Sequence, residues 1–129
     1  MLIGELAERT GLSLRTIRFY EEVGVLDPAS RTKGGFRVFT EDDLQRLLVV
    51  RQMKPLGFSV EEMRELLAAV GRLADGTAGS ARGDATRLVR DYQARVEERA
   101  ADLHEQAGRA DRFAADLHAL IADLRLQRD

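Results

Sequence analysis

Two arginines and an aromatic residue lie close together in residues 13–22, where their spacing would let them contact DNA from one side of a helix. At 100° per residue, Arg15, Arg18 and Phe19 share roughly one helix face with Glu22. The opposite face carries Leu14, Ile17 and Glu21. A guanidinium group presents a planar fork of N–H donors that suits guanine edges and phosphate oxygens. Residues 13–22 therefore predict a DNA recognition helix.

A helix-turn-helix is the element that would hold this segment in place. Ser13 is a typical helix-capping residue, because its hydroxyl can accept a backbone N–H of the first turn. A short first helix, with Ile3, Leu6 and Ala7 as its apolar stripe, ends near Thr10-Gly11. The spacing of Ala7, Gly11 and Ile17 supplies a small residue for close approach, a glycine for the turn and a β-branched residue that locks the second helix against the first.

A β-hairpin wing is predicted directly behind the helix-turn-helix, after Pro28, which ends any helix there. Gly34-Gly35 is a hairpin-turn signal. The residues around it are basic and aromatic: Arg31, Lys33, Phe36, Arg37 and Phe39. The basic side of such a hairpin could lie along phosphates. A solvated surface loop is the alternative for an isolated segment of this kind, and the position behind a helix-turn-helix favours the wing.

Two further helices are predicted, one on either side of Pro55. Thr40 begins the first as an N-cap followed by three acids that complement the helix dipole, and Pro55 should end or kink it. Ser59 and Glu62 form a capping box for the second. The expected buried stripes are Leu44, Leu47 and Leu48 in the first helix and Met63, Leu66, Leu67 and Val70 in the second. The glycine-rich residues 71–83 then indicate a flexible loop or linker.

A heptad repeat predicts a coiled-coil dimerisation helix over residues 84–126. A helix of about 60 Å cannot bury its apolar face on a small domain alone, so a partner helix is required, most simply from a second copy. A back-folded hairpin is less favoured, because Gly108 is the only weak point. The residues predicted to form the seam are Val89, Val96, Ala100, Leu103, Ala107, Ala110, Ala114, Leu117, Ile121 and Leu124.

Composition narrows the classes of protein that fit. The 129 residues carry a formal net charge of −2, so any basic surface for nucleic acid must be local. With no cysteine, the sequence excludes disulfides, thiolate metal sites and a cysteine nucleophile. No apolar run is long enough to cross a membrane, and no secretion signal begins the chain. We therefore expect a soluble cytoplasmic protein that binds no membrane.

The sequence resembles the MerR family of bacterial transcription regulators, in detail over residues 1–70 and only in kind over 84–126. The residues that carry the resemblance are Ile3-Gly4-Glu5-Leu6-Ala7, Gly11-Leu12-Ser13, Thr16-Ile17-Arg18-Phe19-Tyr20-Glu21, Gly24, Arg31, Gly35-Phe36-Arg37, Phe39 and Leu56-Gly57-Phe58-Ser59. The resemblance implies a mostly α fold: a winged helix-turn-helix DNA-binding domain over 1–70, a linker over 71–83 and a dimerisation helix over 84–126 that forms an antiparallel coiled coil.

The resemblance also implies a function and a set of contacts. A homodimer would bind a pseudo-palindromic operator in a promoter spacer and distort it so that RNA polymerase can read both promoter elements. The first wing would contact the DNA backbone, and Arg51 and Lys54 would lie near a second, helical wing. The residues predicted to bind DNA are Arg15, Thr16, Arg18, Phe19, Tyr20, Arg31, Lys33, Gly35, Phe36, Arg37, Arg51 and Lys54. Tyr20 lies nearer the buried side, so it is either core or a phosphate contact.

Two positions depart from the family pattern. The family usually has tyrosine where this chain has Phe36, so a hydroxyl bond to phosphate is lost although the ring can still pack against sugar. Pro55 stands where the family's helix usually continues, which affects the expected geometry of the second wing.

The sequence also bears on functions other than transcription regulation. An enzyme is not expected, because the chain has only two distant histidines, no phosphate-binding glycine loop and no paired carboxylates in an apolar setting. His104 and His118 are too far apart to share a metal ion, so neither a metal nor another cofactor is predicted. A coiled-coil adaptor without specific DNA binding is the alternative function. If a small-molecule effector exists, its expected site is a dimer-interface pocket between the coiled coil and residues 56–80.

Overall fold

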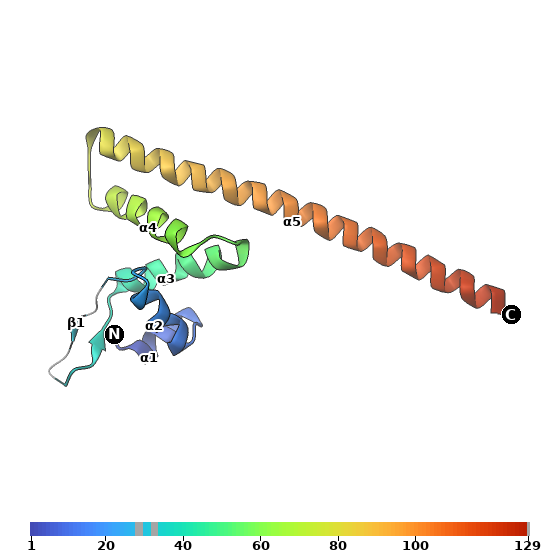
Figure 1. Cartoon of the computed structure of the whole chain (residues 1–129), viewed down its shortest axis with the longest axis horizontal. Helices are drawn as coiled ribbons and strands as arrows, with labels where there is room; N and C mark the ends of the chain where they lie inside the picture. The colour runs from blue at the N-terminus through green and yellow to red at the C-terminus, as the bar shows by residue number, and fades with distance from the viewer. Residues whose placement is uncertain (28–29, 32–33, 129) are drawn as a thin grey trace. The chain divides into compact units, whose positions relative to one another are not determined.

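The computed structural model describes residues 1–27, 30–31 and 34–128 (Figure 1). The chain divides into two compact units, Met1–Asp91 and Tyr92–Asp129. Within its described residues, the first unit contains four α-helices, a 3₁₀ turn, a two-stranded hairpin and the start of a long fifth helix. The described part of the second unit is the remainder of that helix. This arrangement confirms the predicted fold class, a mostly helical protein with a helix-turn-helix followed by a long helix.

The helix-turn-helix consists of α1 (Ile3–Thr10) and α2 (Leu14–Glu22). Gly11 ends α1 in the left-handed region, with φ of 73°, where glycine has no steric penalty. Ser13 caps α2 as predicted, because its hydroxyl oxygen accepts the backbone N–H of Thr16 at 3.1 Å. The side chains of Leu6 and Ile17 are fully buried, so the two helices share the core of the first unit.

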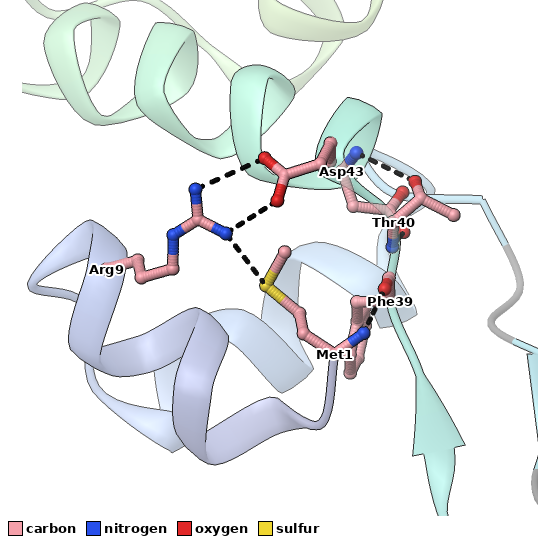
Figure 2. Close-up of polar contacts among 6 residues, drawn as sticks. Met1, Arg9, Phe39, Thr40 and Asp43 are labelled. Carbon is pink, nitrogen blue, oxygen red and sulfur yellow. Dashed lines mark hydrogen bonds and ion pairs between the residues drawn. The ribbon is translucent and has the colours of Figure 1, made fainter.

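The predicted wing is an antiparallel hairpin of two short strands, β1 (Ser30–Arg31) and β2 (Arg37–Val38). Its base is attached to the start of the chain. The amino group of Met1 donates to the carbonyl oxygen of Phe39 at 2.7 Å, and the N–H of Phe39 donates to the carbonyl oxygen of Met1 at 2.7 Å (Figure 2). The Phe39 side chain is buried, which fixes the end of β2 in the core.

Helix α3 (Glu41–Met53) begins at the N-cap predicted for Thr40. Figure 2 shows the link between Thr40 and Asp43, which is a reciprocal capping box: each side chain accepts the backbone N–H of the other. The helix ends before Pro55, as the sequence predicts, and continues as the 3₁₀ turn η1 (Lys54–Leu56), which tolerates a proline in its first positions.

Helix α4 (Val60–Ala74) begins at the predicted capping box of Ser59 and Glu62. Its buried residues include Met63 and Leu67, as expected, but not Val70, which is 41% exposed. The prediction for Val70 is therefore wrong for this chain. The turn of α4 beside it faces the core through Ala69, which is fully buried.

Helix α5 (Gly79–Arg128) is 50 residues long, or about 75 Å at 1.5 Å per residue. It begins five residues before the predicted start at residue 84, so the flexible linker expected over 71–83 overlaps both α4 and α5. Tertiary contacts offset the low helix propensity of the glycines. The Arg82 guanidinium donates to the carbonyl oxygen of Leu73 at 3.3 Å, and the Ala85 side chain is buried.

The second unit exposes a series of large apolar side chains along α5. Those at predicted seam positions are Val96, Leu103, Leu117, Ile121 and Leu124, with 38–53% of each residue exposed. Phe113 and Leu120 are also exposed and widen the apolar face. Among the residues that the structure describes, no helix is long and apolar enough to cross a membrane.

Candidate nucleic-acid interface

The candidate DNA-binding surface is the exposed face of α2. Arg15, Arg18 and Phe19 all lie at the surface, and 45% of Phe19 is exposed. In the described part of the chain, neither guanidinium forms an ion pair or a hydrogen bond with another residue. Both therefore keep their full set of N–H donors available for a ligand of opposite charge. The first turn of α2 contains no acid that would repel one.

The two adjacent aromatic residues of α2 have different roles. The Phe19 and Tyr20 rings are in tilted contact, with centroids 5.6 Å apart. Phe19 is exposed, whereas only 2% of Tyr20 remains exposed, and this burial raises the pKa of its hydroxyl above the ordinary value of 10.0. Of the two alternatives for Tyr20, the structure selects the core residue. A contact between Tyr20 and a DNA phosphate stays a prediction.

Thr16 lies between the surface and the core of α2. Its hydroxyl group is hydrogen-bonded to the Ser13 hydroxyl at 2.8 Å, so in this structure it contributes to the N-terminal cap of the helix. One hydroxyl can donate and accept at once, which leaves Thr16 able to contact a phosphate from the same position.

The wing presents Phe36 prominently, with 66% of the residue exposed, beside Gly35 at φ of 83°. Arg37 follows in β2. Its Nη1 atom lies 2.6 Å from Oε1 of Glu21, so this predicted DNA contact is already paired with an acid of α2. Arg31 pairs with Arg37 in the strand register, and Lys33 lies outside the described residues.

Glu21 lies behind this surface, on the opposite face of α2, and was not predicted as a site residue. Only 15% of its side chain is exposed, and its Oε2 atom is buried without a hydrogen-bond partner. The signal was present in the sequence, because Glu21 lies on the same helix face as Ile17. An acid on an apolar face requires a buried partner, but its identity depends on the fold.

The two basic residues predicted near a second wing differ in their surroundings. Arg51 donates from Nη1 to the carbonyl oxygen of Thr10 at 2.5 Å and so satisfies the C-terminal end of α1. Lys54 lies exposed in η1. Arg51 thus has a structural contact within the first unit, whereas the Lys54 ammonium group is available to solvent.

The arrangement suits DNA better than it suits chemistry on a small substrate. A capped helix with two unpaired arginines can enter a major groove, and a short hairpin attached to the same helix can contact the flanking backbone. His104 and His118 lie exposed on α5. No group of three or more metal-ligating side chains is gathered within the described residues.

Family models match most of the chain. Residues 1–70 match the model described as MerR HTH family regulatory protein, and residues 44–111 match the model described as MerR, DNA binding.

Curated relatives agree with these matches. The HTH-type transcriptional regulator ZntR of Escherichia coli strain K12 is 40% identical over 96 residues, which cover 74% of this chain and 68% of that protein. Heavy metal-dependent transcription regulator 2 of Rhizobium meliloti is 44% identical over 68 residues, which cover 53% of this chain and 46% of that protein.

Solved structures share the fold. A MerR family protein from Listeria monocytogenes superposes with a TM-score of 0.71 at 26% identity and covers 100% of this chain and 99% of its own. HiNmlR, described as a MerR family regulator lacking the sensor domain and bound to promoter DNA, superposes with a TM-score of 0.64 at 26% identity, covering 81% of this chain and 76% of its own.

Proposed function

The chain belongs to the MerR family of DNA-binding transcription regulators, and we propose that it binds a pseudo-palindromic operator as a homodimer and distorts the promoter spacer that contains it. RNA polymerase at that promoter is the second proposed partner. The same proposal assigns the protein no enzymatic activity and locates it in the cytoplasm, where bacterial promoters are transcribed.

The observation that carries the proposal is the exposed face of α2. Arg15 and Arg18 have no partner among the described residues, and Phe19 lies exposed beside them. Exposed guanidiniums without a protein partner keep all their N–H donors free for phosphate and guanine oxygens, so two of them on one helix face favour a polyanionic ligand. HiNmlR, a structural relative, is bound to promoter DNA in its crystal structure.

The dimer is supported by the apolar face of α5. Leu103, Leu117, Ile121 and Leu124 are all about half exposed and recur at heptad positions. A contiguous apolar stripe of this length in one chain favours burial against a second helix. A two-fold dimer would present α2 to two half-sites, which accounts for a pseudo-palindromic operator.

Dimerisation can be tested by sedimentation with matched variants of α5. Leu103→Asp places a charge in the proposed seam and should yield monomers, because a buried unpaired carboxylate is strongly unfavourable. Ala101→Asp adds the same charge two residues away, outside the seam, and should leave the dimer intact. A Leu103→Asp variant that sediments as a dimer would contradict the seam assignment.

DNA binding can be tested by a gel shift at several salt concentrations. The probe is double-stranded DNA selected by the protein from random sequence, and a scrambled version serves as control. Affinity for the selected sequence should fall steeply with salt as phosphate contacts release counterions. No shift of the selected probe would instead favour the alternative, an adaptor that binds no specific DNA. Distortion is measured on the same probe by circular permutation.

The amino-acid composition excludes one class of regulatory signal but does not identify the signal. We propose that the signal is not a metal ion held by thiolates of this chain, since its 129 residues contain no cysteine. In this respect the proposal differs from the description of the Rhizobium meliloti relative, which is named a heavy metal-dependent regulator. The proposed site for a small-molecule effector stays the dimer interface near residues 56–80, and ligand titration into the dimer tests it.

A further inference from the structure

Glu21 and Arg37 form a direct link between the recognition helix and the wing. Glu21 belongs to the last turn of α2 and Arg37 to β2, and their Oε1 and Nη1 atoms are 2.6 Å apart. Within the described part of the chain, Glu21 is the one carboxylate at ion-pair distance from Arg37. Sixteen positions of sequence separate the two residues, so the contact depends on the fold of the hairpin onto the helix.

The position of Glu21 is unfavourable for the helix that carries it. The C-terminal end of a helix has a partial negative charge, which repels carboxylates, and no basic residue lies in the last turn of α2. Burial adds a desolvation cost, because Oε2 is buried and accepts no hydrogen bond. Helix stability therefore does not explain why an acid occupies this position, whereas the contact with Arg37 does.

The contact gives the wing a second attachment. The first is Phe39, whose buried ring and hydrogen bonds to Met1 fix the end of β2. Phe39 holds the base of the hairpin in the core but does not connect the strand to α2. The ion pair at Arg37 makes that connection two residues earlier in the chain, closer to the exposed Phe36.

We propose that Glu21 is a positioning residue for DNA binding: through Arg37 it holds the wing at a fixed place relative to the α2 face and does not itself contact DNA. This inference rests on the proposed DNA-binding function. A fixed separation would let the wing reach phosphates while Arg15 and Arg18 read the groove, so that ordering the wing costs no affinity at the moment of binding.

Electrostatics alone makes the opposite prediction, which allows a decisive test. A carboxylate close to DNA repels phosphates, and it also occupies the Arg37 guanidinium. If Glu21 had no positioning role, its removal should leave binding unchanged or strengthen it. If Glu21 positions the wing, its removal should weaken binding although a negative charge has been lost.

The experiment compares Glu21→Gln with Glu22→Gln. Both variants remove one negative charge from the last turn of α2, but Glu22 is exposed and has no partner among the described residues. Fluorescence anisotropy measures the affinity of each full-length variant for the selected DNA and for scrambled DNA. Hydroxyl-radical footprinting on the selected DNA reports whether the flank contacted by the wing stays protected, and circular dichroism verifies folding.

We expect Glu21→Gln to lose about tenfold in affinity at each half-site of the selected DNA, as for one charged hydrogen bond per protomer, and to lose protection only at the flanks. Glu22→Gln should bind as well as the parent protein or better. Glu21→Asp, which keeps the carboxylate, should recover part of the loss. Glu21→Gln binding as tightly as Glu22→Gln, with the flanks protected, would overturn the inference.

A second variant covers the case in which Glu21→Gln does not fold. Arg37→Lys keeps a positive charge for phosphate but loses the planar fork that fits a carboxylate, so it should lose flank protection in the same way. Full protection in Arg37→Lys would contradict the positioning role. Failure of the unmodified protein to select any DNA sequence would instead refute the proposed function, which keeps the two failures distinct.

Discussion

Replacing Arg18 by alanine should change the affinity for DNA without changing the stability of the fold. The guanidinium is exposed and has no partner among the described residues, so its removal takes away no intramolecular contact. The free energy of unfolding should change by less than about 0.5 kcal/mol. If Arg18 contacts a guanine edge, each half-site should lose about 1–3 kcal/mol. A dimer that reads two half-sites should then lose about 2–6 kcal/mol for the complete operator.

Fluorescence anisotropy with selected and scrambled DNA distinguishes the two kinds of contact that Arg18 could make. A base contact should lower affinity for the selected DNA only and leave the salt dependence nearly unchanged. A phosphate contact should lower affinity for both probes and reduce the slope of log K against log salt by about 0.9 per phosphate. Arg109→Ala is the matched control, because it removes one arginine from an exposed position of α5, where that residue pairs with Glu105.

Either of the first two results below would refute the assignment of Arg18 to the DNA interface, and the third would change the kind of contact that it makes. Unchanged affinity for the selected DNA would remove Arg18 from the interface and leave the exposed α2 face without its central contact. A marked loss of stability in Arg18→Ala would show that the guanidinium supports the fold. Equal losses on both probes would reduce its role to a phosphate contact.

Three further predictions concern the frame that holds this face. Phe39→Ala should reduce the free energy of unfolding by about 3–5 kcal/mol in urea titrations, because the ring is buried, whereas Phe36→Ala at the exposed tip should change it by less than about 0.5 kcal/mol. Thr40→Ala removes one half of the capping box and should cost about 0.5–2 kcal/mol in the same assay; an unchanged urea midpoint would contradict the cap. The Arg9 guanidinium lowers the pKa of Glu41 below its ordinary 4.5, so this pair stabilises the fold above that pH and its contribution is lost as pH falls through the lowered pKa. The urea midpoint should therefore fall more on acidification in the parent protein than in Glu41→Gln, and parallel pH profiles would refute the linkage.

Local signals in the sequence predicted the framework of the DNA-binding unit. Ser13, Thr40 and Ser59 begin helices, and α3 ends before Pro55, as expected. These features depend on hydrogen bonds and steric limits within about four residues, so the sequence contains all the information they need. The exposed arginine face of α2 was predictable for the same reason, since helical periodicity alone determines which residues share a face.

Contacts between distant residues could not be predicted in this way. The sequence left Tyr20 with two alternatives and predicted Arg37 and Arg51 as DNA-binding residues, without a partner inside the protein for either. Packing buries Tyr20, and the fold brings Arg37 to Glu21 and Arg51 to the carbonyl oxygen of Thr10. Each partner lies on a different element, so its identity depends on how the elements pack together.

The sequence by itself determined which side chains share the exposed face of α2, and the tertiary structure decided how that face is held. Arg15 and Arg18 face outward because of helix geometry, which is local. Glu21 reaches Arg37, and α5 begins at Gly79, because packing across the first unit outweighs the local tendencies of a helix-terminal acid and of a glycine-rich segment. Such energies arise only once distant parts of the chain are in contact.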